Sequence, residues 1–320
     1  LMLPNIPQAV IAYYGAMKAG AVVVPMNPLY VEREIQTQLA DSGSETIVAL
    51  DLLYPRIRVV RERAGLPKRI IVTSLRDFLP TAKKLLYPLQ ARWAKRWIVV
   101  EKIAPVYGFL ELLDPVPVAT EAETSSLPSV EPTSLAQIQY TGGTTGVSKG
   151  AMLTHRNILA NLAQAYAWIK PAITEGGEFV VTALPLYHIF ALTVSLFAMR
   201  LGGSLSLIPN PRDIPKFVKV LKKRPFHVLP AVYTLFNALL NNPEFRQLDF
   251  SQLFISQAGG MAASEGTARQ WQQTTGCAMI EGWGMSETCA IGTNNPVTNK
   301  EFTGTIGLPL PGISVAIKDD

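Results

Sequence analysis

The segment Tyr140–Gly150 reads YTGGTTGVSKG and lies between a predicted strand and a predicted helix. Its four glycines leave backbone N–H groups free to face an anion, its three threonines add hydroxyl donors, and Lys149 adds positive charge. A Walker P-loop has lysine directly after its last glycine, whereas Val147 and Ser148 separate Gly146 from Lys149 here. The segment is therefore predicted to bind a polyphosphate outside the ordinary P-loop class, and a turn without a ligand is the alternative.

Short β-branched segments alternate with longer segments of helical period on both sides of this loop. This alternation is typical of an α/β fold in which crossover helices connect the strands of a parallel sheet. Strands are predicted at 21–24, 46–50, 136–140, 179–183, 204–208, 227–229, 253–256 and 278–280, and helices at 5–19, 31–41, 156–169, 189–200, 214–223, 232–241 and 264–274.

Residues 115–134 are rich in Pro, Glu, Ser and Thr and have little helical period, so they are predicted to connect two subdomains. The first α/β subdomain is expected at 1–114 and the second, which contains the glycine–threonine loop, at 135–320. The chain begins at Leu1 in the middle of a pattern, which we interpret as the start of a fragment.

The composition is rich in apolar residues, with 48% hydrophobic residues and a mean hydropathy of +0.20. The longest uncharged apolar stretch, Ile189–Met199, is shorter than the roughly 20 residues that a bilayer span needs, so it is predicted to be a buried helix. Cys277 and Cys289 have no metal-ligand spacing and are expected to be buried thiols of a protein in a reducing compartment. The net charge of +5 favours an anionic partner such as a nucleotide, coenzyme A or a phospholipid surface.

The segment Thr81–Lys102 mixes cations with large apolar side chains, a combination that fits an anionic bilayer with its aromatic rings at the level of the headgroups. The alternative is a helix whose apolar face packs on its own domain and whose basic face is solvated. The basic residues are Lys83, Lys84, Arg92, Lys95 and Arg96, and the apolar ones include Leu85, Leu86, Tyr87, Trp93 and Trp97.

The sequence YTGGTTGVSKG resembles the phosphate loop of the adenylate-forming superfamily, which contains acyl-CoA synthetases, luciferases and peptide-synthetase adenylation domains. The resemblance covers essentially the whole chain and is closest to the bacterial long-chain fatty acid–CoA ligases. It is carried by YTGGTTGVSKGAMLTHRN, TALPLYHIFALT, NPRDIP, TLFNALLNN and GTIGLPLPG. The resemblance implies the large N-terminal domain of that ligase fold, with stacked, mostly parallel sheets and crossover helices, truncated at both ends.

In that family a carboxylate attacks the α-phosphorus of ATP to give an acyl-adenylate and pyrophosphate, and the thiol of coenzyme A then displaces AMP. The resemblance therefore implies ATP, Mg²⁺ and coenzyme A, with catalysis by positioning and charge neutralisation. The implied partners are a fatty acid, ATP and coenzyme A, with a homodimer as a further candidate and no nucleic acid. A cytoplasmic location is expected, with Thr81–Lys102 touching the inner face of the cytoplasmic membrane.

By the resemblance, the loop holds the β- and γ-phosphates, and Thr144 supplies the hydroxyl near Mg²⁺. In EGWGMSET, Glu287 matches the acidic Mg²⁺ contact of the family. Trp283 stands where tyrosine is usual and can still flank adenine, and Ser286 stands where threonine is usual and keeps the hydroxyl. The implied nucleotide-binding residues are Thr141, Gly142, Gly143, Thr144, Thr145, Gly146, Lys149, Gly259, Gly260, Glu281, Gly282, Trp283, Gly284, Ser286 and Glu287.

The sequence QAGGM, which contains Gly259 and Gly260, resembles the turn that lines adenine. His188 in PLYHIFAL matches the position that borders the acyl carboxylate, although a lone histidine in an apolar segment is often a hydrogen-bonded core residue. The implied catalytic residues are Lys149, Thr144, Glu287 and His188. The apolar residues after His188 are either one wall of an acyl tunnel or ordinary core, and they are Phe190, Leu192, Val194, Leu196 and Phe197.

Two alternatives remain open at this level: a ligase for an aryl or medium-chain acid, and a noncatalytic module that binds a nucleotide or an acyl-adenylate. The chain ends at Asp320, before the family's Thr-Gly-Asp segment, its hinge and its catalytic lysine. We therefore expect the 320-residue chain to bind ATP weakly and to turn over poorly.

Overall fold

The computed structural model describes residues 1–113, 128–142 and 148–318. The chain divides into two compact units, Leu1–Met152 and Leu153–Asp320. The predicted connector at 115–134 falls largely within 114–127, outside the described residues, so its role as a linker stays a prediction.

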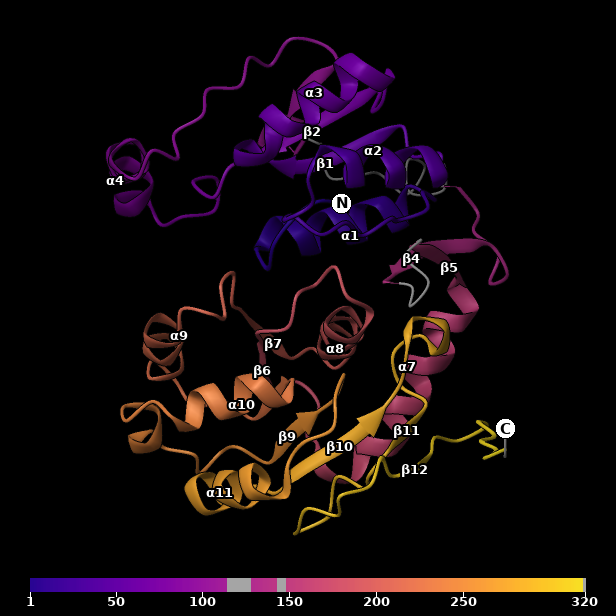
Figure 1. The fold of residues 1–320 in the computed structure, drawn as a ribbon, viewed down its shortest axis with the longest axis vertical. Helices are drawn as coiled ribbons and strands as arrows, with labels where there is room; N and C mark the ends of the chain where they lie inside the picture. Colours follow the sequence, from indigo (N-terminus) through magenta and orange to yellow (C-terminus); the bar gives the residue numbers. More distant parts are fainter. Residues whose placement is uncertain (114–127, 143–147, 319–320) are drawn as a thin grey trace. The chain divides into compact units, whose positions relative to one another are not determined.

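The first unit contains a three-stranded parallel sheet in the order β1–β2–β3 (Figure 1). Its strands are β1 (Thr46–Leu50), β2 (Arg69–Thr73) and β3 (Val106–Gly108), and its helices are α1 (Pro7–Lys18), α2 (Glu32–Asp41), η1 (Asp51–Leu53), α3 (Tyr54–Ala64), α4 (Thr81–Trp93) and α5 (Phe109–Leu113). Ile47 and Ala49 of β1 are two residues apart and therefore face the same side of the sheet. They are buried in one core with Ile35 of α2 and Ile57 of α3.

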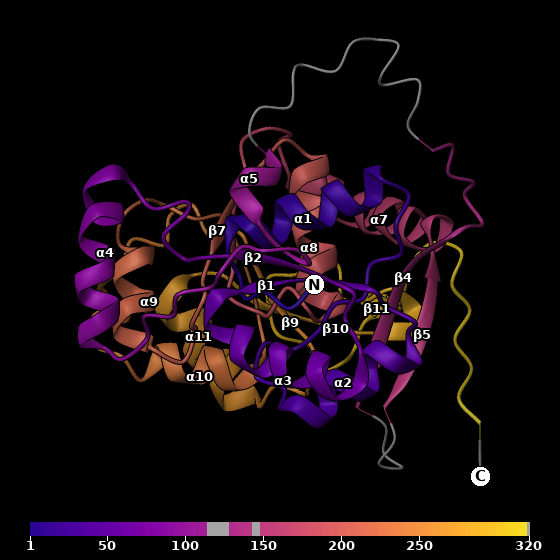
Figure 2. The same cartoon turned by 90° about the horizontal axis from the view of Figure 1, so that it is seen from above.

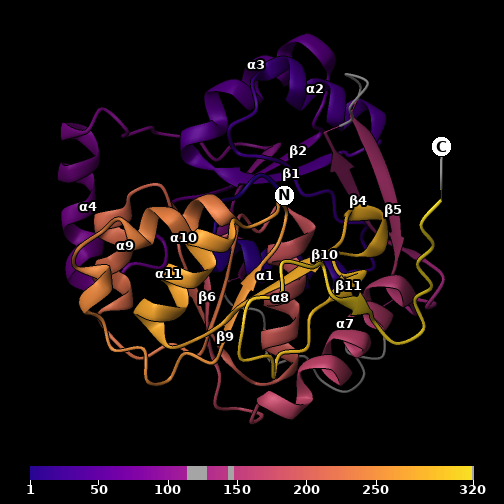
Figure 3. The ribbon, with the colours of Figure 1, turned by 60° about the horizontal axis from the view of Figure 1, so that its bottom comes forward.

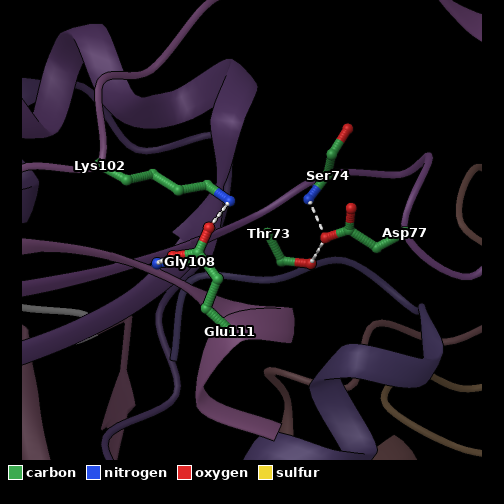
Figure 4. A network of polar contacts seen from close by, with 6 residues as sticks. All are labelled: Thr73, Ser74, Asp77, Lys102, Gly108 and Glu111. Carbon is green, nitrogen blue, oxygen red and sulfur yellow. Dashed lines mark hydrogen bonds and ion pairs between the residues drawn. The ribbon is translucent and has the colours of Figure 1, made fainter. Parts of the chain in front are cut away.

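Hydrogen bonds close the turn that follows β2 (Figure 4). The hydroxyl of Thr73 and the backbone N–H of Ser74 both donate to Oδ2 of Asp77, at 2.7 and 2.8 Å. The buried amide of Gln8 donates to Oγ1 of Thr73 at 3.0 Å. Because Gln8 belongs to α1, the same hydroxyl fixes the turn and holds α1 beside the end of the strand.

A two-stranded sheet, β4 (Leu135–Thr141) with β5 (Lys149–Thr154), carries the glycine–threonine loop between its strands. The sequence did not predict β5, whose residues KGAMLT have little strand propensity. The strand predicted at 21–24 is reduced to an isolated bridge between Val23 and Gln137. A side chain at Gly150 would place its Cβ 2.5 Å from Cγ2 of Ile138, so glycine allows the two strands to approach each other.

The second unit is built on a seven-stranded sheet in the order β12–β11–β10–β9–β8–β6–β7. The strands are β6 (Phe179–Thr182), β7 (Ser204–Leu207), β8 (Val228–Ala231), β9 (Ile255–Ala258), β10 (Met279–Trp283), β11 (Thr293–Asn294) and β12 (Leu308–Pro309). Neighbours from β7 to β10 are parallel, while β11 and β12 add antiparallel pairs at one edge. The predicted α/β fold with mostly parallel sheets is confirmed.

Helices cover both faces of this sheet, with α9, α10 and α11 on one side and α7 and α8 on the other (Figure 2, Figure 3). They span α7 (His155–Ile169), α8 (Ile189–Arg200), α9 (Ile214–Leu221), α10 (Tyr233–Leu240) and α11 (Glu265–Thr275), and short 3₁₀ turns η2 (Lys170–Ala172), η3 (Phe245–Gln247) and η4 (Ser286–Thr288) occur between elements. None of the described helices has the length and apolar character that a bilayer span requires.

The core between the sheet and α9–α11 is centred on Trp271 of α11, which is fully buried. Its ring lies 4.7 Å from that of Phe236 and 5.4 Å from that of Phe245, measured between centroids. The indole N–H donates to the hydroxyl of Ser256 on β9 at 2.9 Å, so the one polar atom of the ring is satisfied. This contact ties the helix layer to the sheet.

We predict that Trp271→Ala lowers the free energy of unfolding by about 3–5 kcal/mol, because it leaves a large cavity and removes the hydrogen bond that Ser256 Oγ accepts from the indole N–H. Trp93→Ala is the matched control, since Trp93 is 89% exposed and its loss should change stability by no more than about 0.5 kcal/mol. Denaturant unfolding followed by circular dichroism measures both. Equal effects of the two substitutions would contradict the assignment of Trp271 to the core.

Candidate functional site

A cavity of about 370 Å³ in the second unit is lined by the sheet and by α7 and α8. This volume lies in the range of small-molecule sites, roughly 300–1,000 Å³. Val228 and Pro230 of β8 line it together with Ile255 and Gln257 of β9. These are alternate residues of their strands, so the cavity lies against the face of the sheet opposite to the Trp271 core.

The cavity extends along the strands. Its lining on β9 and the following turn runs from Ile255 to Gly259, a distance of about 13 Å at the rise of a strand. Gly259 and Gly260 follow the carboxyl end of β9, which is the edge of a parallel α/β sheet where ligands usually bind. The other end of the lining includes the apolar residues Ile169 and Val228 and also the buried carboxylate of Glu178.

The wall formed by α8 matches the predicted tunnel wall in part. Phe190, Val194 and Phe197 line the cavity, as expected for residues at i, i+4 and i+7 on one face of a helix. Leu192 and Leu196 are buried and do not line it, so these two residues agree with the alternative of ordinary core packing. Because α8 is apolar on nearly all sides, its sequence could not show which face borders the cavity.

The two glycines after β9 have different structural roles. A Cβ at Gly259 would lie 3.0 Å from Cε1 of Phe190, so the absence of a side chain gives room to that ring. Gly260 has φ of +79°, in the left-handed region that favours glycine. Whether the turn also lines adenine stays a prediction.

Glu281, one of the implied nucleotide-binding residues, is hydrogen-bonded within the protein. Its side chain is buried and Oε1 accepts a hydrogen bond from the backbone N–H of Ala263 at 2.7 Å. The carboxylate thus fixes the turn that leads from Gly260 to α11, and Glu281 is not among the residues that line the cavity. The direct contact with a nucleotide that the resemblance implied for it stays a prediction.

The segment from Trp283 to Ser286 lines the cavity at the carboxyl end of β10. It folds back on itself, because Gly292 N donates to the carbonyl of Trp283 at 2.8 Å. The approach is close: a Cβ at Gly284 would lie 1.5 Å from the carbonyl oxygen of Ala290, which itself has φ of +104°. Strained backbone of this kind is concentrated at functional sites.

Glu287 lies in η4, is exposed, and makes no hydrogen bond or ion pair with any residue in the described part of the chain. Within those residues there is no cluster of three His, Cys, Asp or Glu side chains that could hold a metal alone. Mg²⁺ commonly takes one or two carboxylates and completes its shell with water and substrate phosphate. Glu287 therefore fits a contact to Mg²⁺ that arrives with a nucleotide, while Thr144, the other predicted metal residue, lies outside the described residues.

His188 lies at the cavity just before α8, and its ring centroid is 4.6 Å from that of Tyr187. The residue is exposed, yet desolvation by its surroundings lowers the pKa of its ring below the usual value. The ring is therefore neutral at pH 7 and offers a neutral hydrogen bond, not a positive charge, to a ligand.

The ends of the glycine–threonine loop are joined by hydrogen bonds. Ser148 Oγ donates to the carbonyl of Thr141 at 2.7 Å, and Thr141 Oγ1 donates to the carbonyl of Lys149 at 3.4 Å. The ammonium of Lys149 is exposed and forms no ion pair among residues 1–113, 128–142 and 148–318. Gly142 is exposed beside it, while Gly143, Thr144, Thr145 and Gly146 lie outside the described residues.

The sequence reasoning missed four polar residues of the cavity, which are Glu178, Thr193, Gln257 and Asn294. Gln257 is the first residue of the QAGGM segment, so the sequence already showed that it lies two residues before Gly259. No local pattern singled out Asn294, which reaches the cavity only through the pairing of β11 with β10.

In a comparison with known protein families, the family model of the AMP-binding enzymes matches the whole chain, residues 1–320. The chain is 44% identical over 321 residues to a long-chain-fatty-acid–CoA ligase of Escherichia coli O157:H7 and 35% identical over 319 residues to one of Bacillus subtilis (strain 168). These matches cover 100% and 99% of the chain and 56% of each relative, so the chain spans little more than half of their length.

Solved structures show the same fold. An anthranilate CoA ligase, AuaEII, in complex with anthranoyl-AMP has a TM-score of 0.80 at 19% identity, covering 97% of this chain and 54% of its own. A long-chain-fatty-acid-CoA ligase from Archaeoglobus fulgidus has a TM-score of 0.77 at 22% identity, covering 97% and 56%.

We predict that the ring protons of His188 titrate in the folded protein with a midpoint below the ordinary value of about 6.5. The folded state then binds this proton less readily than the unfolded state, so acidification through the folded pKa removes stability. Proton NMR titration measures the midpoint, and the spectrum of His188→Gln assigns the resonance. A midpoint above 6.5 would contradict the claim that desolvation lowers the pKa of His188.

Proposed function

Because the chain belongs to the AMP-binding enzyme family, we propose that the whole protein activates a fatty acid with ATP and transfers it to coenzyme A. The observation that supports this most directly is the long apolar cavity that ends at Gly259 and Trp283, at the carboxyl edge of a parallel sheet. A hydrocarbon chain fits such a lining, and a carboxylate at its open end would meet His188.

The relatives support a fatty acid as the acyl substrate, since those of 35–44% identity are named long-chain-fatty-acid–CoA ligases. An aryl acid is the second candidate, because a structural neighbour is an anthranilate ligase. The cavity favours the fatty acid, since its mostly apolar lining continues for about 13 Å along β9, a distance longer than one aromatic ring. A noncatalytic module is disfavoured by the free, exposed carboxylate of Glu287.

In the proposed reaction a carboxylate oxygen of the acid bonds to the α-phosphorus of ATP and pyrophosphate leaves. The sulfur of coenzyme A then bonds to the acyl carbon and AMP leaves. No step needs a nucleophile of the protein, and the two cysteines agree with this. Both are buried, and desolvation raises the pKa of Cys277 and raises that of Cys289 to about 11, so both remain thiols at neutral pH.

The chain's own residues would position and neutralise the reactants. We assign Lys149 and the loop around it to the phosphates, Trp283 to a face of adenine, and neutral His188 to a hydrogen bond with the acyl carboxylate. Glu287 would contact Mg²⁺, whose charge would offset that of the phosphates.

We predict that Glu287→Gln in the whole protein lowers kcat/KM for pyrophosphate release from ATP and palmitate by roughly 100-fold, because an oxygen ligand of the metal loses its charge. Raising the Mg²⁺ concentration should restore part of the rate. Glu301→Gln, which neutralises another exposed carboxylate of the same unit, is the control and should change little. Equal rates for the two variants would remove Glu287 from the proposed site.

We also propose that α4 holds the protein on an anionic membrane surface and that the protein is cytoplasmic. Leu85, Leu89 and Trp93 are 69%, 66% and 89% exposed. They recur every four residues and so form one outward stripe, whereas Ala91 is the only buried residue of the helix. The helix thus turns Leu85, Leu89 and Trp93 toward solvent, while Tyr87 is partly buried, and packing of the apolar face on the domain stays the alternative.

Charge supports an anionic lipid surface as the partner of this stripe. The segment 81–100 contains five basic residues and no acidic one. Three of them, Arg92, Lys95 and Arg96, follow one another at the carboxyl end of α4 and are exposed. Figure 1 shows that long connecting segments join α4 to the rest of its unit, and the carbonyl of Lys84 is held by Arg76 Nε at 3.1 Å. The homodimer implied by the resemblance stays a prediction.

Replacing Arg92, Lys95 and Arg96 by Gln should weaken binding to phosphatidylserine-containing vesicles by roughly 100-fold, at about 1 kcal/mol for each cation near an anionic surface. The matched control replaces Lys219, Lys222 and Lys223 by Gln. These lysines are also exposed, and their replacement also removes three positive charges. Vesicle sedimentation at fixed ionic strength measures both. An equal loss in the two triple variants would mean that overall charge, and not α4, causes the binding.

A further inference from the structure

The cavity wall contains a pair of hydrogen-bonded amides in a lining that is otherwise mostly apolar. Gln257 of β9 and Asn294 of β11 both line the cavity. Nε2 of Gln257 donates to Oδ1 of Asn294 at 2.9 Å and to the carbonyl of Ala258 at 3.0 Å. Asn294 is 5% exposed, so its amide is held in a fixed place within the wall.

The two amides meet across β10, which lies between their strands. The residue of β10 opposite Asn294 is Gly282, and a Cβ there would lie 2.3 Å from Oδ1 of Asn294. Only a residue without a side chain leaves the space in which Gln257 reaches Asn294. The backbone of Asn294 is held on both sides, by Gly282 and by Leu308 of β12. The backbone pairing of Asn294 and the glycine at position 282 therefore hold the two amides in place.

Each amide keeps hydrogen-bonding capacity that the protein does not use. Oε1 of Gln257 and Nδ2 of Asn294 have no partner within the described residues. A buried polar group that loses water without gaining a partner costs about 1–3 kcal/mol. An unsubstituted alkyl chain in the cavity would impose that cost on both atoms. A hydroxyl on the chain could donate to Oε1 and accept from Nδ2, and an oxo group could accept from Nδ2.

The position of the pair limits where such a group can lie on a ligand. Gln257 precedes Gly259 by two residues, about 7 Å along β9 from the carboxyl edge of the sheet. Beyond it the lining contains Ile255, Val228 and Ile169, together with the buried carboxylate of Glu178, whose Oε1 accepts from the backbone N–H of Thr174. A chain whose carboxylate lies at the open end would pass the amides with its first carbons and bury its remaining hydrocarbon beyond them.

We propose that Gln257 and Asn294 form a specificity subsite for a hydroxyl or oxo group near the carboxylate of a fatty acid. The protein then prefers oxygenated fatty acids over unsubstituted acids of the same length. This inference rests on the proposed function, because it takes the cavity as the acyl site. The two amides act on the acyl chain and not on the nucleotide.

The test compares 3-hydroxypalmitate with palmitate in the whole protein. We expect kcat/KM for pyrophosphate release to be roughly tenfold higher with the hydroxy acid, the value of about one additional hydrogen bond. Gln257→Leu and Asn294→Leu should each abolish most of this ratio. The double variant should lose little more than either single one, since the amides act as a pair. The affinity for Mg·ATP without fatty acid should stay as in the unchanged protein.

Two further variants make the test specific. Thr193→Val removes another polar group from the cavity lining, but its hydroxyl is already bonded to the carbonyl of Cys289, so the ratio should not change. Asn294→Asp keeps the size of the side chain and removes its N–H donors, and it replaces the leucine variant if that variant does not fold. Calorimetric titration of each acid into the protein gives the same preference without turnover.

The outcomes separate the two proposals. If neither acid yields acyl-AMP, the proposed function fails and the subsite fails with it. If both acids are activated but the ratio is near one, or stays unchanged in the Gln257 and Asn294 variants, only the subsite is overturned. A loss of Mg·ATP affinity in these variants would likewise overturn it, because the pair would then belong to the nucleotide.

Discussion

The parallel sheet of the second unit has to bury both of its faces, and this constraint determines where a ligand can bind. Strand residues of one parity pack with α9–α11 around Trp271, where rings and aliphatic groups fill the space. Residues of the other parity meet α7 and α8, and there the packing leaves a cavity. Strand alternation thus assigns Leu229 to a filled core and Val228, its neighbour, to the binding face. The same sheet that stabilises the unit therefore forms the wall of its site.

Glycines shape the open end of that cavity as much as the larger residues do. Gly259 gives room to the ring of Phe190, and Gly282 leaves the slot across β10 in which Gln257 meets Asn294. Glu281, which precedes Gly282 on β10 and pairs with Ala258 of β9, holds the turn at Ala263. Polar side chains at this edge thus either form hydrogen bonds with the backbone or line the cavity. The first group has a structural role, and the second is available to a ligand.

In the first unit, one helix does not bury its large apolar side chains. α2 and α3 bury their apolar side chains against β1 and β2, as amphipathic helices do. α4 buries Ala91 and exposes its leucines and Trp93, beside a group of exposed cations. An exposed apolar stripe has a cost in water, which supports the proposal that a surface covers it. An anionic bilayer supplies both an apolar layer and the opposite charge.

Local patterns in the sequence determined the α/β class, most helix and strand positions, and the motif residues around Glu287 and the glycine–threonine loop. α8 at Ile189–Arg200 and β1 at Thr46–Leu50 were predicted at their observed bounds, because their apolar periods and flanking turns are local signals. β5 was missed, since its residues have no such signal. Only the tertiary structure decided which face of α8 borders the cavity, that α4 faces outward, and that Gln257 meets Asn294 37 residues later in the chain. Periodicity shows which residues share a face, but what covers that face depends on contacts between distant segments, which a local pattern does not contain.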